Sequence, residues 1–252
     1  MSILTISDLH LSFSTDKPMN IFGGAWNNHA EHIKENWINT VRDGDVVVLP
    51  GDHSWALRTE DAAADLLFIH SLPGRKILLK GNHDLWWATS RKMQEFKVAN
   101  GLDSIDFLYN DCMSVESGGK MHVIAGTRGW LCPGDNEYKA LEDEKIYTRE
   151  AGRLASSLKK ATALLENFDV AERGNLFVFM HYPPYNQNKN TLFTELIENA
   201  GVSACYYGHI HGFTEKDRKE ARRSNVVLKE RGTLYSLVSC DYTSNRLIKV
   251  TD

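Results

Sequence analysis

The residues of this sequence that could bind a metal ion gather in five short motifs. Each motif follows a run of apolar residues and combines aspartate, asparagine or histidine, often with a glycine beside them. Imidazole and carboxylate together suit Mn, Fe, Co or Zn better than Ca, and the motifs contain no thiolate. In chain order the motifs are Asp8-Leu9-His10, Gly51-Asp52-His53, Gly81-Asn82-His83-Asp84, His181 and Gly208-His209-Ile210-His211.

Each motif has an ordinary structural explanation when it is taken alone. An Asp-x-His segment often caps a turn, and Gly-Asp after a strand is usually a turn itself. Gly-Asn-His-Asp could form a loop with a capping aspartate, and His181 could be a packed histidine. Together these explanations require five coincidences, each at the end of an apolar run. The sequence therefore favours one metal site that is built from several segments.

The elements that must position these motifs alternate between strands and helices. Short apolar runs bounded by Gly, Pro or Asp predict strands, and apolar residues at helical spacing predict helices. This alternation indicates an α/β fold in one domain, residues 1–252, with the last two strands adjacent and antiparallel. The predicted strands are 3–7, 45–50, 76–80, 122–126, 176–180, 204–208, 233–239 and 246–250, and the predicted helices are 29–41, 60–71, 135–168 and 190–199.

The five motifs all begin where a predicted strand ends. Ligands of open α/β sheets gather beyond the carboxyl ends of the strands, so we expect the motifs to meet there. A strand through the last motif would point His209 and His211 to the same face, because side chains alternate along a strand. That arrangement predicts that both imidazoles bind metal.

The order and spelling of the motifs resemble those of the calcineurin-like metallophosphoesterases. That family carries D-x-H, G-D, G-N-H-[DE], H and G-H-x-H in this order, and all five elements are present here between residues 8 and 211. The longer stretches ISDLHLSF, KPMNIFG, PGDHSWA, KGNHDLWW and HYPPYN resemble a group of small bacterial members. The resemblance implies a four-layer αββα sandwich with a dinuclear metal site at the carboxyl ends of the strands.

The resemblance also implies a division of the ligands between two metal ions, with Asp52 bridging them. Two cations at close range repel each other, and a shared carboxylate offsets that repulsion. The ions would be divalent or of mixed valence, with Mn favoured and Fe, Zn or Co as alternatives. By position, one ion takes Asp8, His10, Asp52 and His211, and the other takes Asp52, Asn82, His181 and His209.

The implied chemistry is hydrolysis of a phosphomonoester or phosphodiester. A hydroxide that bridges the two metals would attack phosphorus in line. His83 would stabilise the phosphoryl oxygens and protonate the leaving oxygen as general acid, and Asp84 would orient His83. Two further residues are candidates for substrate binding: Arg128 could grip a phosphoryl group bidentately, and His53 could either point into the site or cap its turn.

Other activities remain as alternatives within the same family. One is a nucleotide or cyclic-nucleotide phosphodiesterase, and another is a lipid-precursor pyrophosphatase. Five of the six tryptophans lie near the motifs, where they could stack on a base or brace the metal-binding loops. The distant alternative is a metal-free interaction scaffold, but this chain keeps every ligand of the family. The protein phosphatases of the family carry an arginine where this chain has Ala56, which disfavours that class.

Composition limits the partners further. The net charge of −4 and the pI of about 6.2 disfavour a nucleic-acid partner, so we expect a small phosphorylated substrate instead. No apolar run reaches the length of a membrane span, and the N-terminus does not resemble a signal peptide. Without such a signal, we expect a cytoplasmic protein in which the four cysteines are reduced. The basic segment 216–231 is either a solvated face or a rim that attracts an anionic substrate.

Overall fold

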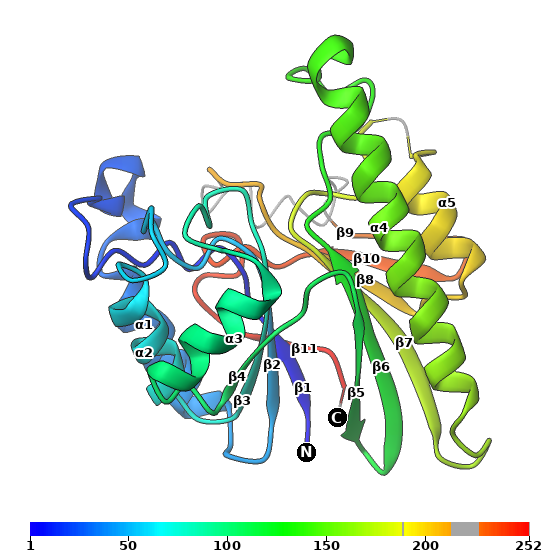
Figure 1. Ribbon diagram of the computed structural model, residues 1–252, viewed down its shortest axis with the longest axis horizontal. Helices are drawn as coiled ribbons and strands as arrows, with labels where there is room; N and C mark the ends of the chain where they lie inside the picture. Colours follow the sequence, from blue (N-terminus) through cyan, green and yellow to red (C-terminus); the bar gives the residue numbers. More distant parts are fainter. Residues whose placement is uncertain (188, 213–226, 252) are drawn as a thin grey trace.

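The computed structural model describes residues 1–187, 189–212 and 227–251, which form two facing sheets (Figure 1). The first sheet has the strand order β11-β1-β2-β3-β4, and all its neighbours are parallel except β11 against β1. Its strands are β1 (Ile3–Thr5), β2 (Val46–Pro50), β3 (Arg75–Leu79), β4 (Ile105–Phe107) and β11 (Ile248–Lys249).

The second sheet has the order β5-β6-β7-β8-β10-β9, with a parallel centre and an antiparallel strand at each edge. Its strands are β5 (Cys112–Ser117), β6 (Lys120–Thr127), β7 (Arg173–Met180), β8 (Ala204–Tyr207), β9 (Val227–Glu230) and β10 (Thr233–Leu237).

Helices cover the outer face of each sheet (Figure 1). On the first sheet lie α1 (His29–Thr40), α2 (Ala63–Ser71) and α3 (Ser90–Ala99). On the second lie α4 (Ala140–Glu166) and α5 (Leu192–Asn199). Two 3-10 turns, η1 (Met19–Phe22) and η2 (Gly24–Trp26), precede α1. Within the described residues, no helix combines the length and apolar character that crossing a membrane requires.

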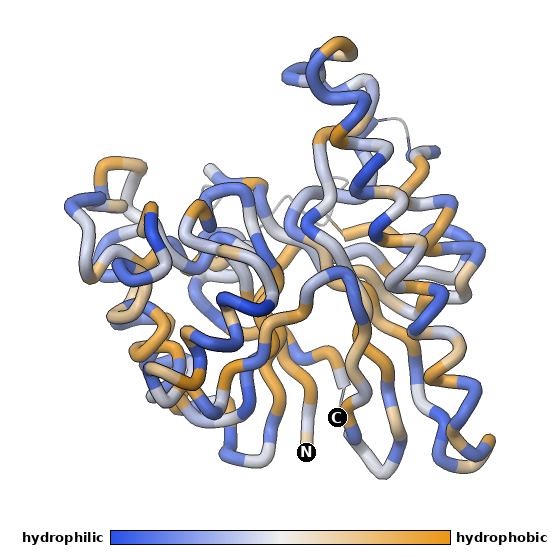
Figure 2. The backbone as a smooth tube through the Cα atoms, viewed as in Figure 1, coloured by the Kyte–Doolittle hydropathy of each residue, from blue (hydrophilic) through white to orange (hydrophobic). Residues whose placement is uncertain are grey.

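Side-chain alternation along the buried strands produces the four layers. In β2, Val47 and Leu49 belong to the core beneath the helices of the first sheet, whereas Val46 and Val48 belong to the core between the two sheets. Figure 2 shows the apolar residues concentrated along such strands. Strands covered on both faces need continuous apolar runs, and this is the pattern that the sequence carries. The predicted αββα sandwich is confirmed.

Some predictions of secondary structure were wrong. The last two strands are not adjacent: β10 lies between β8 and β9, while β11 joins the other sheet beside β1. The strands β4 and β5 and the helix α3 were missed. The helix α3 buries only Met93, so its apolar stripe is weak. Most of the basic segment 216–231 lies outside the described residues, and its described end forms β9.

Candidate metal centre

Strand register brings the motifs to one edge of the molecule. Pro50 of β2 pairs with Leu79 of β3, so the two loops that carry Asp52 and Asn82 leave the first sheet at the same level. In the second sheet, Met180 of β7 pairs with Tyr207 of β8. The loops that carry His181, His209 and His211 therefore also begin at the same edge of their sheet.

A further backbone contact ties the two sheets together at this edge. Ser7 forms a parallel bridge with Ser239, and its N–H donates to the Val238 carbonyl at 2.9 Å. This contact carries the Asp8 loop of the first sheet against the segment that follows β10 of the second.

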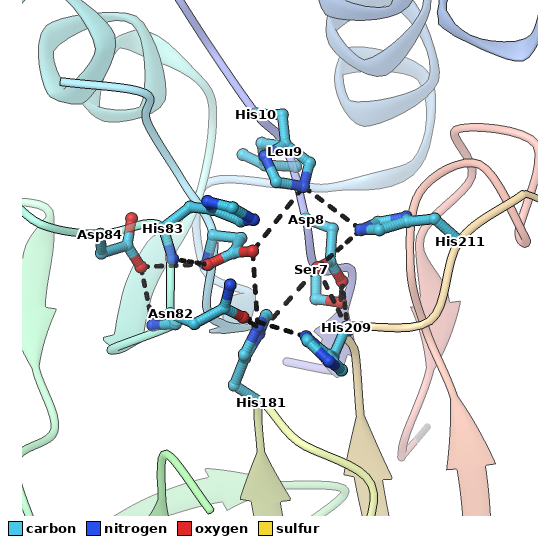
Figure 3. Close-up of polar contacts among 12 residues, drawn as sticks. Ser7, Asp8, Leu9, His10, Asn82, His83, Asp84, His181, His209 and His211 are labelled. Carbon is cyan, nitrogen blue, oxygen red and sulfur yellow. Dashed lines mark hydrogen bonds and ion pairs between the residues drawn. The ribbon is translucent and has the colours of Figure 1, made fainter. Parts of the chain in front are cut away.

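The first group of donors consists of Asp8, His10 and His211, whose ligand atoms lie within 4.8 Å of one another. The Nε2 atoms of the two histidines are 3.2 Å apart, and Asp8 Oδ1 is 3.2 Å from His211 Nε2 (Figure 3). The His211 ring is also held from behind by its Nδ1 contact with Asp241 Oδ1, at 2.9 Å.

The second group consists of Asn82, His181 and His209, whose side chains converge in Figure 3. Asn82 Oδ1 lies 2.6 Å from His181 Nε2 and 2.9 Å from His209 Nδ1. The His181 ring also contacts the Pro50 carbonyl through Nδ1, at 3.1 Å.

Asp52 stands between the two groups. Its Oδ2 atom lies 3.7 Å from His10 Nε2 and 3.4 Å from His181 Nε2, so one carboxylate oxygen faces a histidine of each group. Its Oδ1 atom accepts a hydrogen bond from the His83 N–H at 2.8 Å. The Asp52 carboxylate is therefore fixed in a bridging position.

The donors fit divalent transition metals in type and spacing. Metal–ligand bonds of about 2.1 Å place neighbouring ligand atoms of a tetrahedral ion about 3.4 Å apart. The separations around Asp8, His10, His211 and Asp52 lie between 3.2 and 3.7 Å, whereas those of Asn82 to His181 and His209 are shorter, at 2.6 and 2.9 Å. Burial is the largest influence on His181 and His209 and lowers their pKa values to about 4 and about 3. Both rings are therefore neutral near pH 7, which leaves a lone pair on each for a cation.

Electrostatics in the first group favour a positive charge. Burial acts to lower the pKa of His211, but Asp8 and Asp241 outweigh it and raise that pKa to about 10. The opposite effect appears at Asp52, whose pKa is raised well above its usual value by burial and by the nearby carboxylates of Asp84 and Asp8. A bound cation would offset the same repulsion between carboxylates.

The loops that carry the donors have strained backbones. Asp8, His10, Asp52 and His209 all have positive φ, at 61°, 45°, 55° and 74°. Such conformations are uncommon for residues other than glycine and gather at functional sites, where the surrounding structure holds them. This geometry corrects one prediction: β8 ends at Tyr207, so His209 and His211 occupy a loop and not one face of a strand.

Glycines make room for the donor side chains. A Cβ on Gly81 would collide with Asp52 Oδ1, and a Cβ on Gly208 would collide with Asp8 Oδ2. A Cβ on Gly51 would lie 2.5 Å from His181 Nδ1. These three motif glycines are therefore required by the close approach of the backbone to the candidate donor side chains.

Asp84 holds the loops after β2 and β3 together, and its carboxylate makes no hydrogen bond with the His83 ring. Its buried carboxylate accepts from the N–H groups of Asp52 and His53, both at 2.9 Å, and from Gly81 N–H at 2.8 Å. It lies to one side of the donor groups in Figure 3. The predicted role of Asp84 is therefore corrected: it binds the backbone of two motifs together.

His83 lies beside the donors at the wall of a cavity of about 480 Å³. Its ring centroid is 4.3 Å from that of Trp55 and 5.6 Å from that of His10. The donors His10 and His211 line the same cavity, and apolar side chains, including Met19, Phe22 and Trp26, line the remainder. Burial lowers the pKa of His83, and Asp84 opposes that effect.

The other two predicted substrate contacts lie away from this cavity. His53 is fully buried, and its Nε2 contacts the Leu79 carbonyl at 2.8 Å, so the prediction that it binds substrate was wrong. Arg128 follows β6 at the predicted edge, where its carbonyl accepts from the N–H groups of His181 and Tyr182. The Arg128 side chain, however, lines a separate recess beside Glu150.

Asp241 is a site residue that the sequence reasoning missed. Besides His211, it accepts from the Gly212 N–H through Oδ2, at 3.0 Å. Asp241 follows the predicted strand 233–239, so the same signal of an acidic residue after an apolar run was present. The tryptophans divide in function: Trp26 and Trp55 pack against His10, while Trp86 donates to Asp84.

Comparisons with known proteins agree with this geometry. A sequence profile described as calcineurin-like phosphoesterase matches residues 1–213. A search of curated proteins gave no significant match. Among solved structures, phosphopantetheinyl hydrolase (PptH) from Mycobacterium tuberculosis is similar at 17% identity and a TM-score of 0.54, over 99% of this chain and 95% of that one.

A second similar structure is the protein TT1561 of Thermus thermophilus, at 13% identity and a TM-score of 0.55. That match covers 99% of this chain and 97% of the other. Identities this low support the fold alone, whereas the family profile covers every motif from Asp8 to His211. The chain belongs to the calcineurin-like phosphoesterase family.

Proposed function

We propose that this protein hydrolyses a phosphomonoester or phosphodiester at a pair of metal ions. The observation that carries the proposal is the position of Asp52, whose Oδ2 atom faces both His10 and His181. A carboxylate oxygen between two sets of donors suits two adjacent cations. Family membership supports metal-dependent hydrolysis as the reaction class.

The proposed ligands follow the two groups of donors. Asp8, His10 and His211 would hold one ion and Asn82, His181 and His209 the other, with Asp52 shared. Mn is the favoured metal, with Fe, Zn or Co as alternatives, because nitrogen and oxygen donors without thiolates accommodate all four. When bound, such ions would polarise the phosphoryl group and lower the pKa of a coordinated water.

His83 is the proposed general acid for the leaving group. Its backbone N–H is anchored on Asp52, and Trp55 supports one side of its ring. The ring borders the apolar cavity, so a leaving group seated there would have its oxygen within reach of the imidazole.

The test is His83→Ala with metal content measured in parallel. We expect the hydrolysis of p-nitrophenyl phosphate or bis-p-nitrophenyl phosphate to fall by roughly 10²- to 10⁴-fold, while two ions per chain are retained. His32→Ala is the control, because His32 is an exposed histidine on α1. Full turnover in the His83 variant would exclude the acid role, and absence of bound metal and of turnover with added Mn would exclude the enzyme.

A nucleotide is the second candidate substrate, and the aromatic cavity favours it. Trp26 and Trp55 line the space beside His83, and rings of this kind can stack on a base. Comparison of a nucleoside phosphate with glycerol phosphate tests this directly. We expect a lower KM for the nucleoside phosphate if the cavity binds a base, and equal KM values would rule that out.

The remaining proposals concern the setting of the reaction. We infer a small phosphorylated substrate and a cytoplasmic location, where reduced thiols are stable. The cytoplasmic location is supported by the four cysteines, none of which forms a disulfide: Cys112, Cys132, Cys205 and Cys240.

A further inference from the structure

A second recess, separate from the cavity beside His83, has a strongly basic lining. It has a volume of about 450 Å³, within the range of roughly 300 to 1,000 Å³ that is common for ligand pockets. The charged residues that line it are Lys80, Arg128, Arg149, Glu150 and Arg153. Helix α4 contributes three of them, while Lys80 directly follows β3 and Arg128 directly follows β6.

Glu150 organises the cations but does not neutralise them. Its carboxylate is fully buried, accepts from Arg153 Nη1 at 2.6 Å and lies 3.7 Å from both Arg128 and Arg149. Thr127 Oγ1 donates to the same group at 2.8 Å. Four cations and one carboxylate leave three net positive charges on the lining.

The side chains keep donors for a ligand. The Arg128 and Arg149 guanidinium groups are 3.7 Å from Glu150, beyond hydrogen-bond distance, and their side chains are 21% and 52% exposed. Guanidinium groups can bind phosphate oxygens through two parallel hydrogen bonds. The Glu150 carboxylate is already hydrogen-bonded to Arg153 and does not satisfy the donors of Arg128 and Arg149. A multivalent anion would satisfy these donors and the excess charge together.

We propose that this basic recess, formed by Lys80, Arg128, Arg149 and Arg153 around Glu150, binds a phosphate or diphosphate group outside the metal centre. The recess opens at the same strand edge as that centre: Lys80 lies two residues before Asn82, and the Arg128 carbonyl accepts from the His181 N–H. The group is either a second phosphate of the substrate or a free anion. The first option, a phosphate of the substrate, rests on the proposed function. Anion binding in the recess does not depend on that function.

Binding is tested with inorganic pyrophosphate and full-length protein by calorimetry. The Asp52→Asn background removes the bridging carboxylate of the metal centre, so that the recess is measured by itself. In that background we expect Arg149→Gln to weaken binding by about tenfold and Arg149→Glu to weaken it further. Arg149 is exposed, and Arg153 still holds the Glu150 carboxylate in both variants. The free energy of unfolding of each variant is measured by urea denaturation alongside the calorimetry.

The matched control is Lys145→Gln, which removes one positive charge from an exposed position on the same helix. It should leave the affinity unchanged. Equal affinities in the Arg149 variants and the control, or binding that disappears with Asp52→Asn alone, would overturn the proposed site without touching the proposed function.

Kinetics separate the two sources of the anion. If the recess holds a second substrate phosphate, Arg149→Gln raises KM about tenfold for bisphosphoglycerate and leaves KM for glycerol phosphate unchanged. If it holds a free anion, neither KM changes, although the variant binds pyrophosphate more weakly.

Discussion

The contact between His211 and Asp241 shows how single residues outside the motifs shape the site. Asp241 is buried, and its carboxylate holds both the His211 ring and the Gly212 N–H. A carboxylate behind a ligating imidazole fixes the ring orientation and raises its basicity. We therefore assign Asp241 as a positioning residue for the candidate metal centre.

Asp241→Asn tests this assignment. The amide keeps the shape of the side chain but removes the charge, so we expect metal affinity to fall by roughly 10- to 100-fold. Metal titration with a chelating competitor measures the change. Asp61→Asn, at an exposed position, serves as the control, and an Asp241 variant with unaltered affinity would contradict the assignment.

For single residues, the sequence predicts the candidate metal donors better than the residues that hold those donors in position. Asp52 and Asn82 were found because their motifs follow apolar runs, and side-chain type limits what they can bind. The hydrogen bonds of Asp84 to backbone N–H groups depend on how two loops pack, which no local pattern encodes. The same holds for His53, which the fold buries against the Leu79 carbonyl.

At the scale of elements, the loops after the strands depend on glycine. Gly81→Ala would push a methyl group into Asp52, so we expect loss of metal binding and a destabilisation of about 1–3 kcal/mol. Gly152 on α4 has open space around its Cβ position, and Gly152→Ala should stabilise the protein by about 0.5–1 kcal/mol. Chemical denaturation and metal analysis of both variants measure these opposite effects, and similar behaviour of the two would disprove the crowding at Gly81.

A buried histidine in β6 predicts a pH dependence of stability. His122 Nδ1 accepts from the Asn175 N–H at 3.0 Å, so its ring must be neutral, and burial lowers the pKa of His122 from its usual 6.5. Below pH 6.5 the unfolded chain takes up a proton that the folded chain resists, so this contribution to stability falls as the pH falls. It is fully present above that pH.

Replacing the histidine isolates its contribution. We expect His122→Gln to reduce the loss of unfolding free energy between about pH 7.5 and about pH 5.5, as measured by urea denaturation. His32→Ala should keep the full pH dependence, because His32 is exposed in the folded chain as well. A variant at position 122 with an unreduced pH dependence would assign the effect elsewhere.

Continuous apolar runs were sufficient to predict the central strands, but not their neighbours. β2 and β3 stand out because both of their faces are covered. β4 has the sequence Ile-Asp-Phe, so a charged residue interrupts its apolar run. β11 lies within the predicted strand 246–250, but its run did not indicate which strand it pairs with. The pairing of β11 with β1 instead of β10 results from the packing of the whole chain, so no local signal contains it.

At the scale of the whole molecule, the core between the two sheets determines whether the metal centre stays assembled. Donors from both sheets meet at one edge, so their positions depend on the apolar layer beneath them. That layer includes Val48 and Ile77 of the first sheet and Phe177 and Phe179 of the second. The single domain predicted from the sequence requires this layer to couple the two halves in unfolding.

Phe179→Ala tests that coupling. Phe179 is fully buried, so we expect a loss of about 3–5 kcal/mol in the free energy of unfolding.

Tryptophan fluorescence reports mainly on the first half, because Trp26, Trp37, Trp86 and Trp87 pack in the core of the first sheet. Far-UV circular dichroism reports strongly on the second, through the 27 residues of α4. We expect both signals to show one coincident transition that shifts equally in the variant, whereas Val170→Ala, at a residue 82% exposed, shifts neither. Separate midpoints, or a shift in one signal alone, would mean that the sheets unfold independently and that the metal centre spans two domains.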